Sequence, residues 1–213
     1  MFDVIMYRGF GRISEFETIL TINKTRRKNM KNKTARFITQ AAIIAALYVV
    51  LSLLTYSFSY LEIQCRVAEA LCMTIFYTPA GVFGVFVGCL ITNIFGGSWI
   101  DIVFGSLATL IAAVLTKPIA DCIRKKHGPV LSVKNSLLIP IPTVIVNTII
   151  IPFVLYYGYG ITSMGSATAT AAVLGLMAFS ICAGEVISCY VFGPILVKIM
   201  NRVDQSLHLS LED

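Results

Sequence analysis

Polar and apolar residues of this chain are separated into long blocks, with apolar stretches of about the length that crosses the hydrocarbon core of a bilayer. Such stretches predict membrane-spanning helices, because a helix satisfies its own backbone hydrogen bonds in lipid. The apolar blocks cover residues 37–56, 67–95, 102–120, 137–157 and 171–199.

The second block is too long for one ordinary span. Its roughly 29 uncharged residues would form a helix of about 44 Å, against a hydrocarbon thickness of about 30 Å. Thr78-Pro79-Ala80-Gly81 lies near its middle, and proline with glycine favours a tight turn there. We therefore predict two short spans, 67–78 and 80–95, and six spans in total.

Composition and charge support this topology. The chain of 213 residues is 57% hydrophobic and 13% charged, with a mean hydropathy of +0.82, so a soluble domain is excluded. Its net charge of +6 comes from basic clusters that flank the spans, which indicates cytoplasmic loops and not a nucleic-acid surface. The clusters are Lys24 to Arg36, Lys117 to Lys134, and Lys198 with Arg202.

With six spans, both termini and every Lys and Arg except Arg66 lie on the cytoplasmic side, whereas five spans would place the Arg124 to His127 cluster outside. The predicted fold is a compact all-α bundle of six transmembrane helices in the cell membrane. We expect a polar tail at 1–29, a membrane domain at 30–200 and a cytoplasmic tail at 201–213. Met30 opens a run that is typical of a membrane-protein start, so we expect the functional chain to begin there.

The sequence lacks the residues that several kinds of site require. The cysteines have no paired C-x-x-C spacing, and both histidines, His127 and His208, lie outside the spans, so we expect no metal site and no serine–histidine dyad. No G-x-x-x-x-G-K-[ST] loop is present to bind ATP. We therefore expect a protein without a cofactor that is not an enzyme.

Charges near the outer ends of the spans are the first candidate site. Glu62, Arg66 and Glu69 have i, i+4 and i+7 spacing, which places them on one face if an α-helix begins near Glu62. Asp101 follows the third span. Side chains that ionise near a bilayer cost roughly 2.5–3.5 kcal/mol each at a helix centre, so they persist mainly for function. The alternative is a surface salt bridge of under about 1 kcal/mol.

Glu185 is the sharper candidate, because it is the only charged residue between Asn135 and Val197. It should face the bundle interior, paired with Arg66 or with a ligand, or else protonated and bonded to a neighbouring helix. Asn93 and Asn147 are further amides inside spans, which either join helices or bind ligand.

Small residues on the first span, Ala41, Ala42, Ala45 and Ala46, recur at four-residue spacing. Such a face lets helices approach closely in lipid. It serves either packing within the bundle or the docking of a partner.

Taken together, several segments resemble the QueT family of queuosine-precursor transporters, the substrate-binding S components of energy-coupling factor (ECF) transporters. The resemblance covers about residues 30–200. The segments are Ile63-Gln64-Cys65-Arg66-Val67-Ala68-Glu69-Ala70-Leu71, Thr78-Pro79-Ala80, Gly88, Asn93, and Asp101-Ile102-Val103-Phe104-Gly105-Ser106-Leu107-Ala108-Thr109-Leu110.

This resemblance implies a six-helix subunit that captures a 7-deazaguanine or queuine outside and delivers it inward with a transmembrane coupling subunit and two cytoplasmic ATPases. The alanine stripe is similar to the Ala-x-x-x-Ala motif that docks on the coupling subunit. Alternatives are a stand-alone secondary transporter and an S component for another vitamin-like ligand, with an intramembrane enzyme as a third. The expected ligand-binding residues are Arg66, Glu69, Asp101, Glu185, Trp99, Asn93 and Asn147.

Overall fold

The computed structural model describes residues 33–55, 66–158 and 167–207, with side chains for 33–55, 66–158 and 170–203. The chain divides into two units, 1–39 and 40–213. The first unit contributes the start of a helix, in which Thr39 Oγ1 donates to the carbonyl of Ala35 at 2.9 Å. All packing and site geometry below lie within the second unit. The predicted tail at 1–29 and Glu62 fall outside the described residues.

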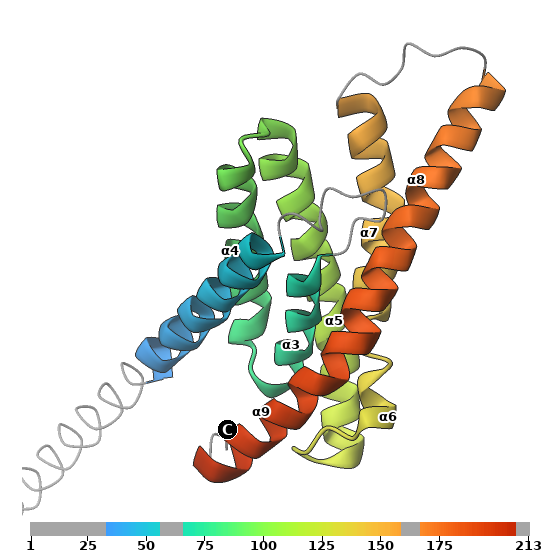
Figure 1. The fold of residues 1–213 in the computed structure, drawn as a ribbon. Helices are drawn as coiled ribbons and strands as arrows, with labels where there is room; N and C mark the ends of the chain where they lie inside the picture. The colour runs from blue at the N-terminus through green and yellow to red at the C-terminus, as the bar shows by residue number, and fades with distance from the viewer. Residues whose placement is uncertain (1–32, 56–65, 159–166, 208–213) are drawn as a thin grey trace, which may run out of the picture. The chain divides into compact units, whose positions relative to one another are not determined.

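The described residues form helices joined by short connections, with no strand among them, which confirms the predicted all-α class (Figure 1). Four helices are long and apolar enough to cross a membrane, and two shorter apolar helices, Val67–Tyr77 and Ala80–Gly96, lie between the first and second of them. The long helices are Lys33–Leu54, Asp101–His127, Val133–Gly158 and Thr170–Val203. Their positions follow the predicted spans, and the crossing by all six segments stays a prediction.

These helices are built from shorter elements, of which Figure 1 labels α3 to α9. In chain order after helix 33–54 they are η1 (Val67–Met73), α3 (Thr74–Tyr77), α4 (Ala80–Gly96), η2 (Asp101–Gly105), α5 (Ser106–His127), α6 (Val133–Ser136), α7 (Ile141–Phe153), η3 (Val154–Gly158), α8 (Ala167–Ile187), η5 (Ser188–Phe192) and α9 (Gly193–Leu207). Helix α9 thus continues past residue 200, where the membrane domain was predicted to end.

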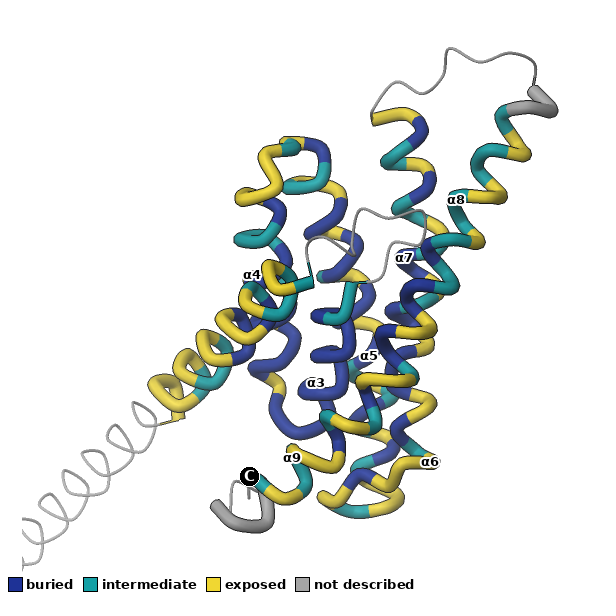
Figure 2. Tube along the Cα trace, in the orientation of Figure 1, coloured by how far each residue is buried: buried dark blue, intermediate teal, exposed yellow. Residues whose placement is uncertain are grey.

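The segment η1–α3 is the core of the second unit. Every residue from Ala68 to Thr78 is buried, which Figure 2 shows as continuous dark blue. It packs against α4, α5, η5 and α9. A helix buried on all sides must be apolar all round, so Glu69 inside this segment requires a specific partner.

The start of η1 corrects one prediction. An α-helix from Glu62 would place Arg66 and Glu69 on one face, but η1 begins at Val67 as a 3₁₀-helix. Arg66 precedes it with non-helical backbone angles, φ −94° and ψ 88°. The Glu69 N–H bonds the Arg66 carbonyl at 2.9 Å, three residues back. The tighter 3₁₀ turn therefore replaces the assumed α-helical spacing.

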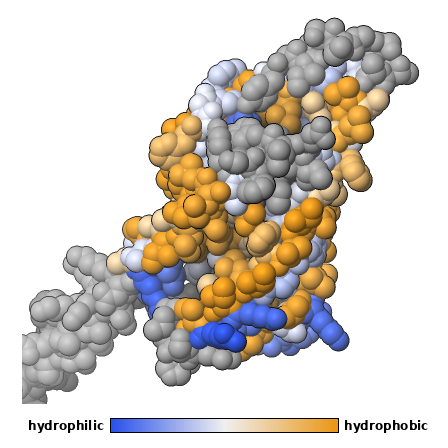
Figure 3. Space-filling model, in the orientation of Figure 1, coloured by the Kyte–Doolittle hydropathy of each residue, from blue (hydrophilic) through white to orange (hydrophobic). Residues whose placement is uncertain are grey.

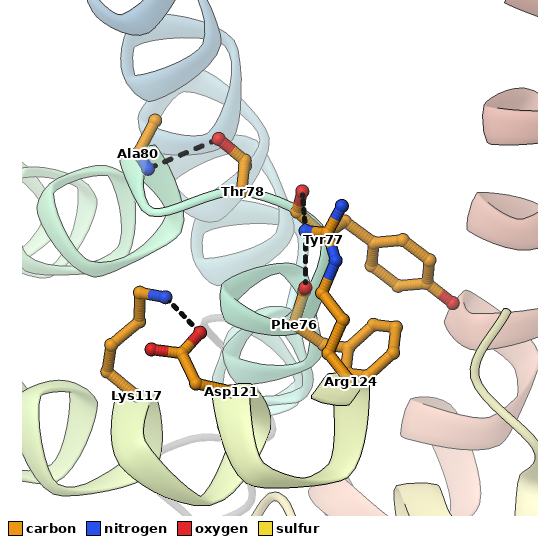
Figure 4. Close-up of polar contacts among 7 residues, drawn as sticks. All are labelled: Phe76, Tyr77, Thr78, Ala80, Lys117, Asp121 and Arg124. Atoms are coloured by element: carbon orange, nitrogen blue, oxygen red, sulfur yellow. Dashed lines mark hydrogen bonds and ion pairs between the residues drawn. The ribbon is translucent and has the colours of Figure 1, made fainter. Parts of the chain in front are cut away.

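The predicted turn at Thr78-Pro79 is confirmed between α3 and α4. Figure 4 shows Arg124 of α5 donating to the last carbonyls of α3, Phe76 O at 3.5 Å and Tyr77 O at 3.4 Å. These carbonyls have no partner within a helix that ends there. Thr78 Oγ1 accepts from the Ala80 N–H at 3.2 Å, so side chains complete both helix ends at the turn.

Helix 33–54 approaches α4 closely. A Cβ added at Gly84 would lie 2.6 Å from the Cβ of Ile44, and one at Gly88 would lie 2.5 Å from the Cβ of Tyr48. Both distances are below van der Waals contact, so only glycine allows the two helices this separation. The inward face of helix 33–54 is therefore set by Ile44, Ala45 and Tyr48, which are all buried.

The outside of the bundle suits a bilayer. Large apolar side chains are exposed on every long helix, and Figure 3 shows apolar surface next to a hydrophilic zone. Exposed basic side chains gather at the end of α5 and in α6 and α9: Lys125, Lys126, Lys134, Lys198 and Arg202. This is a multi-pass protein of the cell membrane.

Candidate functional site: a buried polar cavity

A small cavity is lined by residues from η2, α5, α7 and α8, together with Arg66 just before η1. Its volume of about 10 Å³ has room for roughly one water molecule. Charged and amide side chains contribute to its wall beside the aliphatic side chains of two isoleucines. The lining residues are Arg66, Gly105, Thr109, Asn147, Ile151, Ile181 and Glu185.

Glu185 and Asn147 form the acidic side of this cavity. The Asn147 amide nitrogen donates to Glu185 Oε1 at 2.7 Å, across α7 and α8. Both side chains are nearly inaccessible, at 3% for Asn147 and 4% for Glu185. The prediction that Glu185 faces the bundle interior is thus confirmed by its burial.

Asn147 also carries an unused acceptor. Because its nitrogen bonds the carboxylate, its Oδ1 points elsewhere, and among the described residues this buried oxygen has no hydrogen-bond partner. Buried side-chain oxygens are rarely left unpaired in proteins. An unpaired amide oxygen on the wall of a polar cavity is therefore an acceptor available to a ligand or a water.

Arg66 supplies the donors. It lines the cavity, and within the described part of the chain its guanidinium has no hydrogen bond and no ion pair. Its charge interacts with those of Glu69, Asp101 and Glu185. A guanidinium presents five N–H donors in one plane, so Arg66 can bond a planar ligand while the surrounding acids offset its charge.

Glu69 is held by a residue that the sequence did not single out. Tyr48 of helix 33–54 donates its hydroxyl to Glu69 Oε1 at 2.5 Å, and both side chains are buried. Tyr48 lies on the same inward stripe as Ala41 and Ala45, seven and three residues earlier. The sequence signal that could have identified Tyr48 was a tyrosine in line with small residues within an apolar span.

Asn93 forms a separate polar cluster. Its nitrogen lies 2.9 Å from the Asp101 carbonyl, 3.2 Å from Ser106 Oγ and 3.4 Å from Cys89 Sγ. These contacts join α4 to η2 and α5. In this arrangement the Asn93 amide ties helices together, which is one of the two roles expected for it.

Asp101 and Trp99 lie at the start of the helix that leads into α5. Asp101 is partly buried and begins η2, and its charge interacts with that of Arg66. The Trp99 side chain is 69% exposed. The structure therefore brings Arg66, Asn147 and Glu185 to one cavity, with Glu69 beside them and Trp99 apart.

Three π-helical segments include or closely follow residues that line the cavity. Gly105 on its wall ends η2, while Ile151 and Glu185 each lie three residues before a π-helical segment, η3 and η5. Such wide turns are rare and occur frequently at functional sites. Their coincidence here with buried charge supports a ligand-binding role for the cavity.

The four alanines of helix 33–54 divide between two faces. Ala45 is buried and Ala41 partly buried, on the side that approaches α4, whereas Ala42 and Ala46 are exposed. The first pair therefore takes the packing role. The second pair lies on the exposed face of the helix.

Among the described residues, no group of three or more His, Cys, Asp or Glu side chains could hold a metal ion. The site offers hydrogen bonding and charge pairing through the residues that line it. It combines a planar donor, a carboxylate, an amide oxygen and aliphatic walls.

Comparison with known proteins identifies a family. A family model described as the QueT transporter matches residues 38–202. The queuosine precursor transporter QueT of Lactococcus lactis subsp. cremoris (strain MG1363) is 40% identical over 83 residues, which are 38% of this chain and 48% of the relative. The matched region thus spans about half the length of that relative. No solved structure matches the chain.

Proposed function

Because this chain belongs to the QueT transporter family, we propose that it is the substrate-binding S component of an ECF-type importer. Its ligand would be a queuosine precursor, either a 7-deazaguanine or queuine. The protein would capture this ligand from outside and deliver it inward together with a transmembrane coupling subunit and two cytoplasmic ATPases. The relative's name supports the ligand class, and the absence of a phosphate-binding loop in the sequence supports separate ATPases.

The observation that carries the proposal is the cavity between Arg66, Asn147 and Glu185. A deazaguanine presents a ring N–H and an exocyclic amine side by side, together with a carbonyl oxygen. Glu185 and the unpaired Asn147 Oδ1 are acceptors for such donors, and Arg66 is a donor for the carbonyl. Each polar group of the ligand's edge then has a partner of the opposite kind.

The acidic side chains suit a ligand that carries a positive group. Glu185 lines the cavity, and Glu69 lies three residues after Arg66, which also lines it. Some deazaguanine precursors carry a cationic aminomethyl group, for which a carboxylate is the matching partner. Asp101, Asn93 and Trp99 remain predicted ligand residues, and none of them is among the residues that line the cavity.

Binding requires the site to widen. A cavity of about 10 Å³ accommodates roughly a water, whereas a fused two-ring base is many times larger. The cavity walls would therefore have to separate when the base enters.

Docking on the coupling subunit would use the exposed face of helix 33–54. Ala42 and Ala46 are exposed there and are flanked by exposed Ile43, Leu47 and Val50. Small side chains allow a second helix to approach closely. Ala41 and Ala45, which face α4, would contribute to docking only through the packing they support.

A ligand screen by calorimetry on the purified protein tests the proposal. Deazaguanines, queuine, guanine and common vitamins are compared, and at least one deazaguanine should bind with a Kd well below micromolar. Glu185→Gln should weaken that binding by more than about tenfold, a loss of about 1.4 kcal/mol. Asp121→Asn is the control, because Asp121 pairs with Lys117 in α5 and does not line the cavity.

Outcomes that contradict the proposal are distinct. Preference for a vitamin would redirect the ligand assignment, and wild-type affinity in Glu185→Gln would overturn the site. Uptake into vesicles by the purified protein alone, at the full rate, would indicate a stand-alone transporter. A chemically altered ligand, detected by mass spectrometry, would indicate an enzyme.

A further inference from the structure

We propose that Tyr48 is a positioning residue through which helix 33–54 holds the charged groups beside the cavity in their ligand-binding arrangement. The inference rests on the proposed ligand site but assigns a role to a residue outside it. Tyr48 is not among the residues that line the cavity. It therefore acts on the ligand through Glu69 and Arg66.

The contact between Tyr48 and Glu69 joins two distant parts of the chain. The hydroxyl of Tyr48 lies 2.5 Å from Glu69 Oε1, and the two residues are 21 positions apart. Tyr48 is 1% exposed and Glu69 3%, so water does not compete for this bond. Hydrogen bonds to a carboxylate in such surroundings are short and strong.

Glu69 passes this constraint to the cavity. Its backbone N–H donates to the Arg66 carbonyl at 2.9 Å, and Arg66 lines the cavity. With Oε1 fixed by Tyr48, Glu69 holds the first turn of η1 in place. Arg66, which directly precedes that turn, therefore keeps its position on the cavity wall.

Close contact with Gly88 of α4 fixes the side chain of Tyr48. A Cβ at Gly88 would lie 2.5 Å from the Cβ of Tyr48 and 2.9 Å from its ring, so the tyrosine sits directly on the backbone of α4. It cannot shift without moving helix 33–54. The helix whose outer face carries Ala42 and Ala46 is thus the helix that positions the charges of the site.

The test compares binding of aminomethyl-deazaguanine, measured by calorimetry, in four forms: wild type, Tyr48→Phe, Glu69→Ala and the double variant. Loss of one hydrogen bond to a charged group should weaken binding by about tenfold in Tyr48→Phe. Because Tyr48 acts through Glu69, the same change in the Glu69→Ala background should cost nothing further. A merely structural tyrosine would give additive losses.

Tyr77→Phe is the matched control. Tyr77 is also a buried tyrosine, and it donates to Asn201 Oδ1 at 2.6 Å, but it lies at the far end of η1–α3 from Arg66. Its removal should leave the affinity unchanged. Affinity loss equal to that of Tyr48→Phe would show that any lost tyrosine hydrogen bond disturbs the site, and would overturn the inference.

A spectroscopic measurement covers the case in which Tyr48→Phe does not fold. 3-Fluorotyrosine incorporated at Tyr48 should shift its ¹⁹F resonance when the ligand is added, whereas the same label at Tyr77 should not. An unchanged resonance at Tyr48, or unchanged affinity in Tyr48→Phe while Glu185→Gln is weakened, overturns the inference alone. If the wild type binds no deazaguanine at all, the proposed function is contradicted, and the role of Tyr48 in binding is contradicted with it.

Discussion

At the scale of single residues, the pair of Asn147 and Glu185 shows how a buried polar group can be both structural and functional. Their hydrogen bond spans α7 and α8 at 2.7 Å, which stabilises the contact between these helices. The same bond orients the Asn147 amide so that its oxygen stays unpaired. Stability alone would not require a polar pair with an unpaired oxygen, because apolar side chains of similar size often stabilise a helix contact equally well.

This argument predicts the behaviour of a double variant. Asn147→Leu or Glu185→Leu alone leaves one buried polar partner unsatisfied and should lower the unfolding free energy by about 1–3 kcal/mol. Asn147→Leu with Glu185→Leu removes both partners and should recover most of that loss. Thermal unfolding in detergent measures stability, and calorimetry should find no ligand binding in the double variant. Retained binding there would contradict the functional role.

Residue chemistry also decided which parts of the site could be predicted. Glu185 and Arg66 stood out because isolated charges in apolar spans are expensive. Tyr48 did not, because a tyrosine in an apolar helix is ordinary and its bond to Glu69 depends on how two distant segments pack. The assignment of Asn93 likewise needed its three neighbours.

At the scale of elements, local sequence predicted boundaries better than helix type. The turn at Thr78-Pro79 was predictable, because proline and glycine limit the backbone locally. The 3₁₀ geometry of η1 and the π-helical η2, η3 and η5 were not, since no residue type specifies them alone. Their geometry follows from neighbouring elements, as when η1 packs between α4 and η5.

Glycines in α4 provide a prediction about element packing. Gly88→Ala would place a Cβ 2.5 Å from that of Tyr48, so helix 33–54 must move away. Such overpacking should destabilise the protein by about 1–3 kcal/mol and weaken ligand binding through Glu69. Gly175→Ala in α8 is the control, because nothing lies within 4 Å of the added Cβ. It should leave stability unchanged or raise it by up to about 1 kcal/mol; equal losses in both variants would contradict the packing argument.

At the scale of the whole molecule, the hydropathy pattern and the asymmetric distribution of basic residues predict the membrane topology. The apolar blocks predicted every described helix longer than a few turns, because lipid demands continuous apolar helices. The short segment Val67–Tyr77 has 11 residues and is buried almost completely, so other helices and not lipid surround it. Hydropathy alone could not distinguish such an enclosed segment from a lipid-facing span.

The predicted orientation can be tested at the two ends of one continuous helix. Asp101–His127 has 27 residues, or roughly 40 Å, which is long enough to place its two ends on opposite sides of a bilayer. Lys126→Cys and Trp99→Cys replace exposed side chains near these ends. If the basic clusters are cytoplasmic, a membrane-impermeant maleimide should label Trp99→Cys in intact cells and Lys126→Cys only in inverted vesicles. The unsubstituted protein, with its own six cysteines, gives the background labelling to be subtracted. Labelling of Lys126→Cys in intact cells would reverse the orientation and place the Arg66 end of the site on the cytoplasmic side.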